Sequence, residues 1–143
     1  MFYEFEHFLP GDFLELSKEL YFKIGTFEST PSAIKRNVYS RVYYATFLYV
    51  REWLVRYKQY ASNKRDHTEI PNFIRHHGPF NPVDNQKIAS DLERLKKLRH
   101  QADYYLTRDD CFRYGEIWIN DDIDFAFETA DNIINKFLQC RNH

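Results

Sequence analysis

The stretch from Ser32 to Tyr60 constrains the fold most, because it contains neither glycine nor proline and repeats apolar residues at helical spacing. Its apolar stripe is formed by Ile34, Val38, Val42, Ala45, Leu48 and Leu54. This spacing is typical of an amphipathic α-helix. The stripe is widened almost all round by Tyr43, Tyr44, Phe47, Tyr49 and Trp53. The sequence therefore predicts a long helix that is either central in the fold or buried on a second side by a partner chain.

Two more helices are predicted on either side of this one. A long helix follows Pro10-Gly11-Asp12, with Asp12 as its N-cap, and Gly25 ends it. Phe13, Leu16, Leu20 and Ile24 form its apolar face. After residue 60, the segment NKRDHTEIPNFIRHHG is expected to be a loop followed by a short helix, which Gly78 ends.

A clear start signal opens the next long helix, because Asn81 can cap its N-terminus and Pro82 suits its first turn. This helix is expected to run to about Leu106. Its inward residues are Ile88, Leu92, Leu95, Leu98 and Ala102. The segment CFRYGEIWI is either an irregular loop or a short extended piece. Asn120-Asp121-Asp122 then opens a last helix, with acids in the first turn, where the helix dipole favours them.

These elements predict an all-α fold, an up-and-down bundle of four long helices plus a short one. The 143 residues suit a single domain. The N-terminus MFYEFEHFLPGD lacks the basic start and apolar run of a signal peptide, and no window has about 18 uninterrupted apolar residues. We therefore expect a cytoplasmic protein without a membrane segment, in which Cys111 and Cys140 are reduced thiols.

Charge is unevenly distributed along the chain, although the formal net charge is −1. Basic residues concentrate in 41–65 and 87–100, and acidic residues in 109–131. Such a basic middle can bind an anion on one side, but on charge alone ordinary solvated helix faces are the favoured explanation. The chain has no His-Glu-x-x-His, no zinc-like cysteine pair, no glycine-rich phosphate loop and no Gly-x-Ser-x-Gly. We therefore expect neither a metal site nor a cofactor.

One dense polar cluster borders an apolar stripe, within KKLRHQADYYL at residues 96–106. Asp103 lies four residues after Arg99, and Tyr104 four after His100, so both pairs can touch across one helical turn. An arginine held by an acid beside a groove can clamp a phosphate, because its fork matches two phosphate oxygens. The alternative is an Arg–Asp pair that only stabilises its own helix, by about 0.3–0.5 kcal/mol.

A second cluster lies in SRVYYATF, where Arg41 and Tyr44 are three residues apart and Ala45 permits close contact. If the two long helices are neighbours, one groove is expected to be lined by Arg41, Tyr44, Arg99, Asp103 and Tyr104. His67, at the start of the short helix, would close the end of this groove. The alternative is that the aromatic residues here belong to the core, with their phenol groups reaching the surface.

Three segments in this order resemble the HEPN domain (higher eukaryotes and prokaryotes nucleotide-binding), over roughly residues 11–138. They are SRVYYATFLYVREWL, DHTEIPNFI and LERLKKLRHQADYYL. The similarity is closest to the small stand-alone prokaryotic branch, and the acidic last helix DDIDFAFETADNIINKFL fits it. The resemblance implies a helical bundle that usually forms a homodimer. It also implies RNA chemistry without a metal, often in a toxin paired with a minimal nucleotidyltransferase antitoxin.

Ribonucleases of this family carry an arginine followed, after four to six residues, by a histidine. From Arg99, four residues intervene and Tyr104 stands at the histidine position, where a side chain that titrates near 10 is a poor base. From Arg94, five residues intervene before His100, but a step of six turns about 240° net on a straight helix, so the two side chains point apart. The longer Arg-x-x-Ala-Asp-Tyr alignment favours the Arg99 pairing. In some family pairs the antitoxin attaches AMP to a tyrosine near this place, where Tyr104 and Tyr105 stand; ordinary helix-end packing is the alternative.

The resemblance thus implies a HEPN-domain protein of a toxin–antitoxin or defence system that binds RNA or a nucleotide, with Arg41, Tyr44, His67 and Arg94 as binding residues. The alternative is an active endoribonuclease toxin. In it, Arg99 binds phosphate, His100 is the general acid and base, and Asp103 orients the arginine, with Tyr104 beside them. A purely structural oligomerising bundle is a further alternative.

Overall fold

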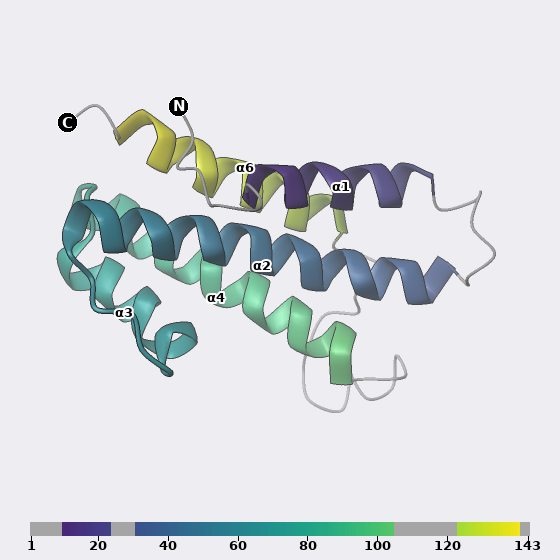
Figure 1. The fold of residues 1–143 in the computed structure, drawn as a ribbon, viewed down its shortest axis with the longest axis horizontal. Coiled ribbons are helices and arrows are strands. Elements are labelled where there is room, and N and C mark those ends of the chain that lie inside the picture. Colours follow the sequence, from purple (N-terminus) through teal and green to yellow (C-terminus); the bar gives the residue numbers. More distant parts are fainter. Residues whose placement is uncertain (1–9, 24–30, 105–122, 141–143) are drawn as a thin grey trace.

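The structure, a computed structural model, describes residues 10–23, 31–104 and 123–140, and every element in these ranges is an α-helix. The helices are α1 (Pro10–Phe22), α2 (Pro31–Lys58), α3 (Asp66–His77), α4 (Pro82–Tyr104) and α6 (Ile123–Cys140). Helices α1, α2, α4 and α6 alternate in direction along the longest axis, and α3 lies beside one end of α4 (Figure 1). The predicted all-α class is therefore confirmed for this part of the chain. Within the described residues α1 has 13 residues and α3 has 12, so α1 is not the long helix that was predicted.

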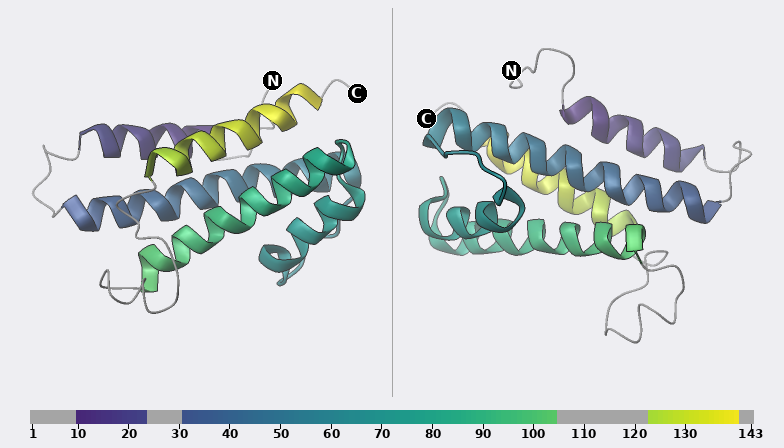
Figure 2. Two further views of the ribbon diagram at one scale, coloured as in Figure 1. Left: turned by 180° about the vertical axis from the view of Figure 1, so that it is seen from behind. Right: turned by 60° about the horizontal axis from the view of Figure 1, so that its bottom comes forward.

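Helix α2 lies at the centre, with α1, α3, α4 and α6 all packed against it (Figure 2). Its aromatic side chains are buried inside the single chain: Tyr39, Tyr43, Phe47, Tyr49 and Trp53. The first of the two interpretations, a central helix, is confirmed. Because these aromatic residues are covered by the chain itself, their number gives no support to a partner chain.

The predicted helix end at Gly78 and the predicted N-cap at Asn81 are both confirmed. The Asn81 side chain accepts a hydrogen bond from the Asp84 backbone N–H at 2.8 Å, which is the geometry of an N-cap. The Gly78 N–H bonds the Ile74 carbonyl and ends α3. A Cβ at position 78 would collide with the Asn85 side chain and the Ile74 carbonyl, so glycine is required by close approach.

The predicted N-cap at Asp12 is wrong. Helix α1 begins at Pro10, so Asp12 lies inside its first turn. A proline suits the first helical position because its missing N–H has no helical partner there. The carboxylate of Asp12 still benefits from the positive end of the helix dipole.

Several expectations concern residues outside the described ranges. These are the helix end at Gly25, the CFRYGEIWI segment, the helix start at Asn120-Asp121-Asp122, Cys111, and Tyr105 with Leu106. Cys140 is a free thiol. Among the helices described, none combines the length and apolar character needed to cross a membrane.

Candidate functional site

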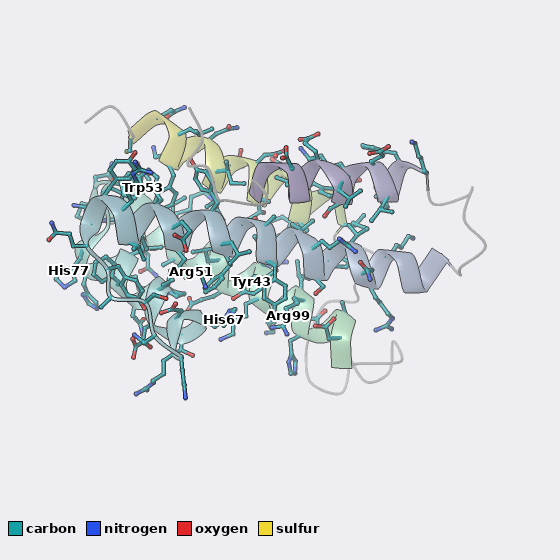
Figure 3. All side chains as sticks on the ribbon, in the orientation of Figure 1. Tyr43, Arg51, Trp53, His67, His77 and Arg99 are labelled. Atoms are coloured by element: carbon teal, nitrogen blue, oxygen red, sulfur yellow. The ribbon has the colours of Figure 1, made fainter. Side chains whose placement is uncertain are left out.

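The side chains of Tyr43, His67 and Arg99 meet where α2, α3 and α4 come together (Figure 3). Tyr43 comes from the middle of α2, His67 from the first turn of α3, and Arg99 from the C-terminal part of α4. These three residues, with Tyr44, Phe47, Lys96 and Asp103, are called the junction site below. The site thus combines residues far apart in the sequence through the packing of three helices.

His67 is held against aromatic rings of α2. Its Nδ1 lies 2.6 Å from the Tyr43 hydroxyl, within hydrogen-bond distance. Its ring stacks on Phe47, with centroids 4.1 Å apart and planes 12° apart, and it meets the Tyr44 ring edge-on at 6.1 Å. One hydrogen bond and a stacked ring fix both the position and the plane of the imidazole, which is half-buried.

Arg99 is also held from two sides. Its Nε donates to the Asp103 carboxylate at 3.1 Å, one helical turn along α4. Its guanidinium carbon lies 5.0 Å from the centre of the Tyr44 ring and 5.9 Å from that of Tyr43, within the range of cation–π attraction. No residue in the described ranges hydrogen-bonds the terminal nitrogens Nη1 and Nη2. The two terminal nitrogens of Arg99, which would bind phosphate oxygens, are therefore not engaged by any described residue.

The start of α3, which carries His67, is fixed by the buried carboxylate of Asp66. That carboxylate accepts hydrogen bonds from the Tyr60 hydroxyl at 2.8 Å, the Ser62 hydroxyl at 2.6 Å and the Asn63 backbone N–H at 2.8 Å. Although burial raises the pKa of Asp66, these three hydrogen bonds bring it below the usual value. The loop after α2 is thereby tied to the first turn of α3.

Lys96 of α4 makes a second link to His67 by compensating for a proline inside α3. In an α-helix the N–H of residue 71 would bond the carbonyl of residue 67, but Pro71 has no N–H. The Lys96 Nζ donates to that carbonyl at 3.4 Å. The carbonyl that Pro71 leaves without a backbone donor thus accepts a hydrogen bond from the ammonium group of Lys96.

The surroundings of His67 favour its neutral form. Burial lowers the pKa of His67, the cations Lys96, Arg99 and Arg51 lower it further, and the carboxylate of Asp66 opposes them. Burial also raises the pKa of Tyr43, so its phenol keeps its proton. The junction site thus carries two cations, Arg99 and Lys96, beside a histidine whose neutral form is favoured.

Of the residues predicted from sequence, the structure brings together Tyr44, His67, Arg99 and Asp103. Arg41 and Arg94 each make a contact outside this group. The Nε of Arg41 donates to Asn37 on its own helix at 2.6 Å, and the Arg94 guanidinium lies over Phe125 of α6 at 4.5 Å. His100 is exposed on α4, and Tyr104 is the last residue of α4.

Three junction-site residues were not among the sequence candidates: Tyr43, Phe47 and Lys96. The core interpretation of Tyr43 and Phe47 is confirmed, because they are 2% and 3% exposed. Both nevertheless contact His67 as well. Two sequence patterns could have pointed to these residues. Tyr43 and Phe47 are four residues apart, and Lys96 lies three residues before Arg99, so each pair shares a helix face.

Neither a cluster of metal ligands in the described ranges nor a similar known protein adds to the description of the site. Within the described ranges, no three or more His, Cys, Asp or Glu side chains gather as metal ligands would. No family model matches the chain, and no curated protein or solved structure is detectably similar to it.

Proposed function

We propose that this chain is a HEPN-like protein that binds RNA or a nucleotide through a phosphate group at the junction site. The single observation that carries the proposal is the state of Arg99. Asp103 and two tyrosine rings hold the guanidinium in place, while no described residue bonds its terminal nitrogens. An oriented arginine fork with free donors matches the geometry of phosphate oxygens.

The neighbouring groups support the same ligand chemistry. Lys96 adds a second cation and His67 a ring nitrogen, Nε2, that no described residue hydrogen-bonds. Tyr44 supplies an aromatic ring beside the arginine, and aromatic rings are surfaces on which single-stranded bases stack. This combination favours single-stranded RNA or a nucleotide over a simple anion. The HEPN resemblance adds the expectation of a homodimer and of a minimal nucleotidyltransferase as partner.

An active endoribonuclease is the second candidate. The proximity of His67 to Arg99, through their shared contacts with Tyr43 and Tyr44, favours it. In such a reaction the RNA 2′-OH would attack the adjacent phosphorus, and arginine would stabilise the added charge. His100, which is exposed on α4, is the histidine that the sequence proposed for proton transfer.

The first test is the affinity for a fluorescently labelled single-stranded RNA, measured by polarisation. Arg99→Ala is expected to weaken binding about tenfold or more, because a hydrogen bond between charged groups contributes about 1.5–3 kcal/mol. The matched control is Arg56→Ala, which removes an exposed arginine from the far end of α2. Equal affinity of Arg99→Ala and the wild type would refute the phosphate-binding role.

The two candidate functions are separated by incubating the same RNA with the protein in EDTA. Cleavage that disappears in Arg99→Ala would establish a metal-independent ribonuclease. His67→Ala and His100→Ala then decide which histidine takes part. Binding without cleavage in the wild type would leave the RNA-binding function alone, and neither binding nor cleavage would leave only the structural bundle.

A further inference from the structure

The hydrogen bond between Tyr43 and His67 can run in either direction, and burial decides between them. Tyr43 is 2% exposed, and among the described residues its hydroxyl has a hydrogen-bond partner only in His67 Nδ1, at 2.6 Å. If Nδ1 carried the proton and donated to the phenol oxygen, the phenolic O–H would point into the core without an acceptor. A buried donor left unsatisfied is costly, so the phenol donates and Nδ1 accepts.

This direction fixes the protonation state of the whole imidazole. A neutral ring with an unprotonated Nδ1 carries its single proton on Nε2. Protonation of the ring would make Nδ1 a donor and leave the phenolic proton without an acceptor. The charged groups around His67 act in the same sense: Arg51 from α2 and Lys96 and Arg99 from α4 oppose a positive ring, while Asp66 of α3 favours it. Asp103 is engaged with Arg99.

We propose that Tyr43 is a positioning residue that holds His67 neutral with its proton on Nε2, giving the junction site a fixed N–H donor beside the arginine fork. Its ligand would be a phosphate oxygen, and this part of the inference rests on the proposed function. His67 is only half-buried, and no described residue bonds its Nε2. In the resting site, His67 is therefore a hydrogen-bond donor, so in the ribonuclease alternative its Nε2 would give a proton and not take one.

The tautomer itself is measured by long-range ¹H–¹⁵N NMR of the full chain with labelled histidine, between pH 5 and 8. The His67 signal is assigned by its loss in His67→Gln. The expected result is an unprotonated Nδ1 and a protonated Nε2 at pH 7. In Tyr43→Phe, the two tautomers are expected to mix and the pKa of His67 to rise, because the hydrogen bond that favours the neutral ring is removed. Tyr49→Phe, which removes another buried phenol from α2, should leave the His67 signals unchanged.

The donor role is tested with the same single-stranded RNA. Adding RNA should shift the His67 Nε2 signal. His67→Asn keeps an acceptor near Nδ1 but loses the distal donor, so its affinity should fall about fivefold to tenfold. His67→Gln, which can place an N–H near the Nε2 position, should stay within about threefold of the wild type.

The outcomes separate this inference from the proposed function. A protonated Nδ1 in the wild type, or an unchanged tautomer in Tyr43→Phe, would overturn the role of Tyr43 even if RNA binds. The expected tautomer together with no RNA binding would overturn the proposed function and the phosphate-donor role with it. RNA binding with equal loss in His67→Asn and His67→Gln would overturn the donor role alone.

Discussion

At the level of single residues, Arg99 and His67 in the junction site each use one nitrogen for a structural contact and keep a further nitrogen for a ligand. Arg99 uses Nε for Asp103 and leaves its terminal nitrogens; His67 uses Nδ1 for Tyr43 and leaves Nε2. Buried polar groups without a partner are rare in folded proteins, whereas partly exposed ones with spare donors can accept a ligand. Side chains that are held in place and still have spare donors distinguish the junction site from an ordinary surface ion pair.

The lowered pKa of Asp66 should make the stability of the folded protein depend on pH. A carboxylate whose pKa is lower in the folded than in the unfolded chain adds stability above the unfolded value, about 3.9, and this stability is lost as the pH falls through the folded value. Asp66→Asn should therefore cost about 1–3 kcal/mol at pH 7, because one acceptor becomes a donor facing other donors.

The check is urea unfolding of both proteins at pH 7 and between pH 5 and 2.5. The gap between the wild type and Asp66→Asn should narrow as the pH falls below about 4. Glu128→Gln, which changes an exposed carboxyl on α6, is the control and should follow the wild type. A gap that widens on acidification would contradict the lowered pKa.

Among the helices, short-range signals in the sequence were sufficient at the boundary between α3 and α4, but they placed the start of α1 too late in the chain. The cap at Asn81 and the stop at Gly78 depend on contacts within a few residues, and both were predicted. The choice between Arg94 and Arg99 could not be settled in this way. Five positions on a helix differ by about 140° around its axis, so their surroundings depend on which helices pack on each side.

The missing backbone N–H of Pro71 in α3 should make the contact of Lys96 with the His67 carbonyl important for stability. Lys96→Met should cost about 1 kcal/mol, because the His67 carbonyl loses its donor. In Pro71→Ala the backbone N–H of residue 71 can bond that carbonyl, so the same lysine substitution should cost less than half as much.

A double-mutant cycle from chemical unfolding measures this coupling. Lys87→Met is the matched control, because it removes an exposed lysine of α4 that pairs with Asp91 along its own helix. Additive effects of the Lys96 and Pro71 substitutions would show that the lysine does not replace the missing backbone donor.

In the whole molecule, the apolar periodicity predicted the class of fold, and for α2 it left two alternatives, a central place or burial by a partner chain. It could not predict which aromatic residues would have a second role. Tyr43 and Phe47 belong to the core by pattern and by burial, yet their contact with His67 depends on how α3 is placed against α2. Contacts between helices far apart in the sequence leave no periodic signal, so this part of the site required the structure.

The packing of the core can be tested at Phe137 of α6. Its fully buried ring packs against Trp53 of α2 at 5.1 Å and Phe80 before α4 at 5.0 Å. Phe137→Ala should cost about 3–5 kcal/mol, because it leaves a cavity where three segments meet. Leu138→Ala, at the half-buried neighbouring position, should cost clearly less. Thermal unfolding that ranks the two variants in the opposite order would contradict this packing.

The most direct test of the central claim is to observe where RNA contacts the protein. Arginine side-chain Nε–H signals can be followed by NMR in arginine-labelled protein while single-stranded RNA is added, with Arg99→Lys used for assignment. The Arg99 signal is expected to shift first and furthest, and the signal of Arg56, at the far end of α2, is expected to stay unchanged. RNA that shifts other arginines while Arg99 does not move, or that shifts none, would contradict the assignment of phosphate binding to the junction site.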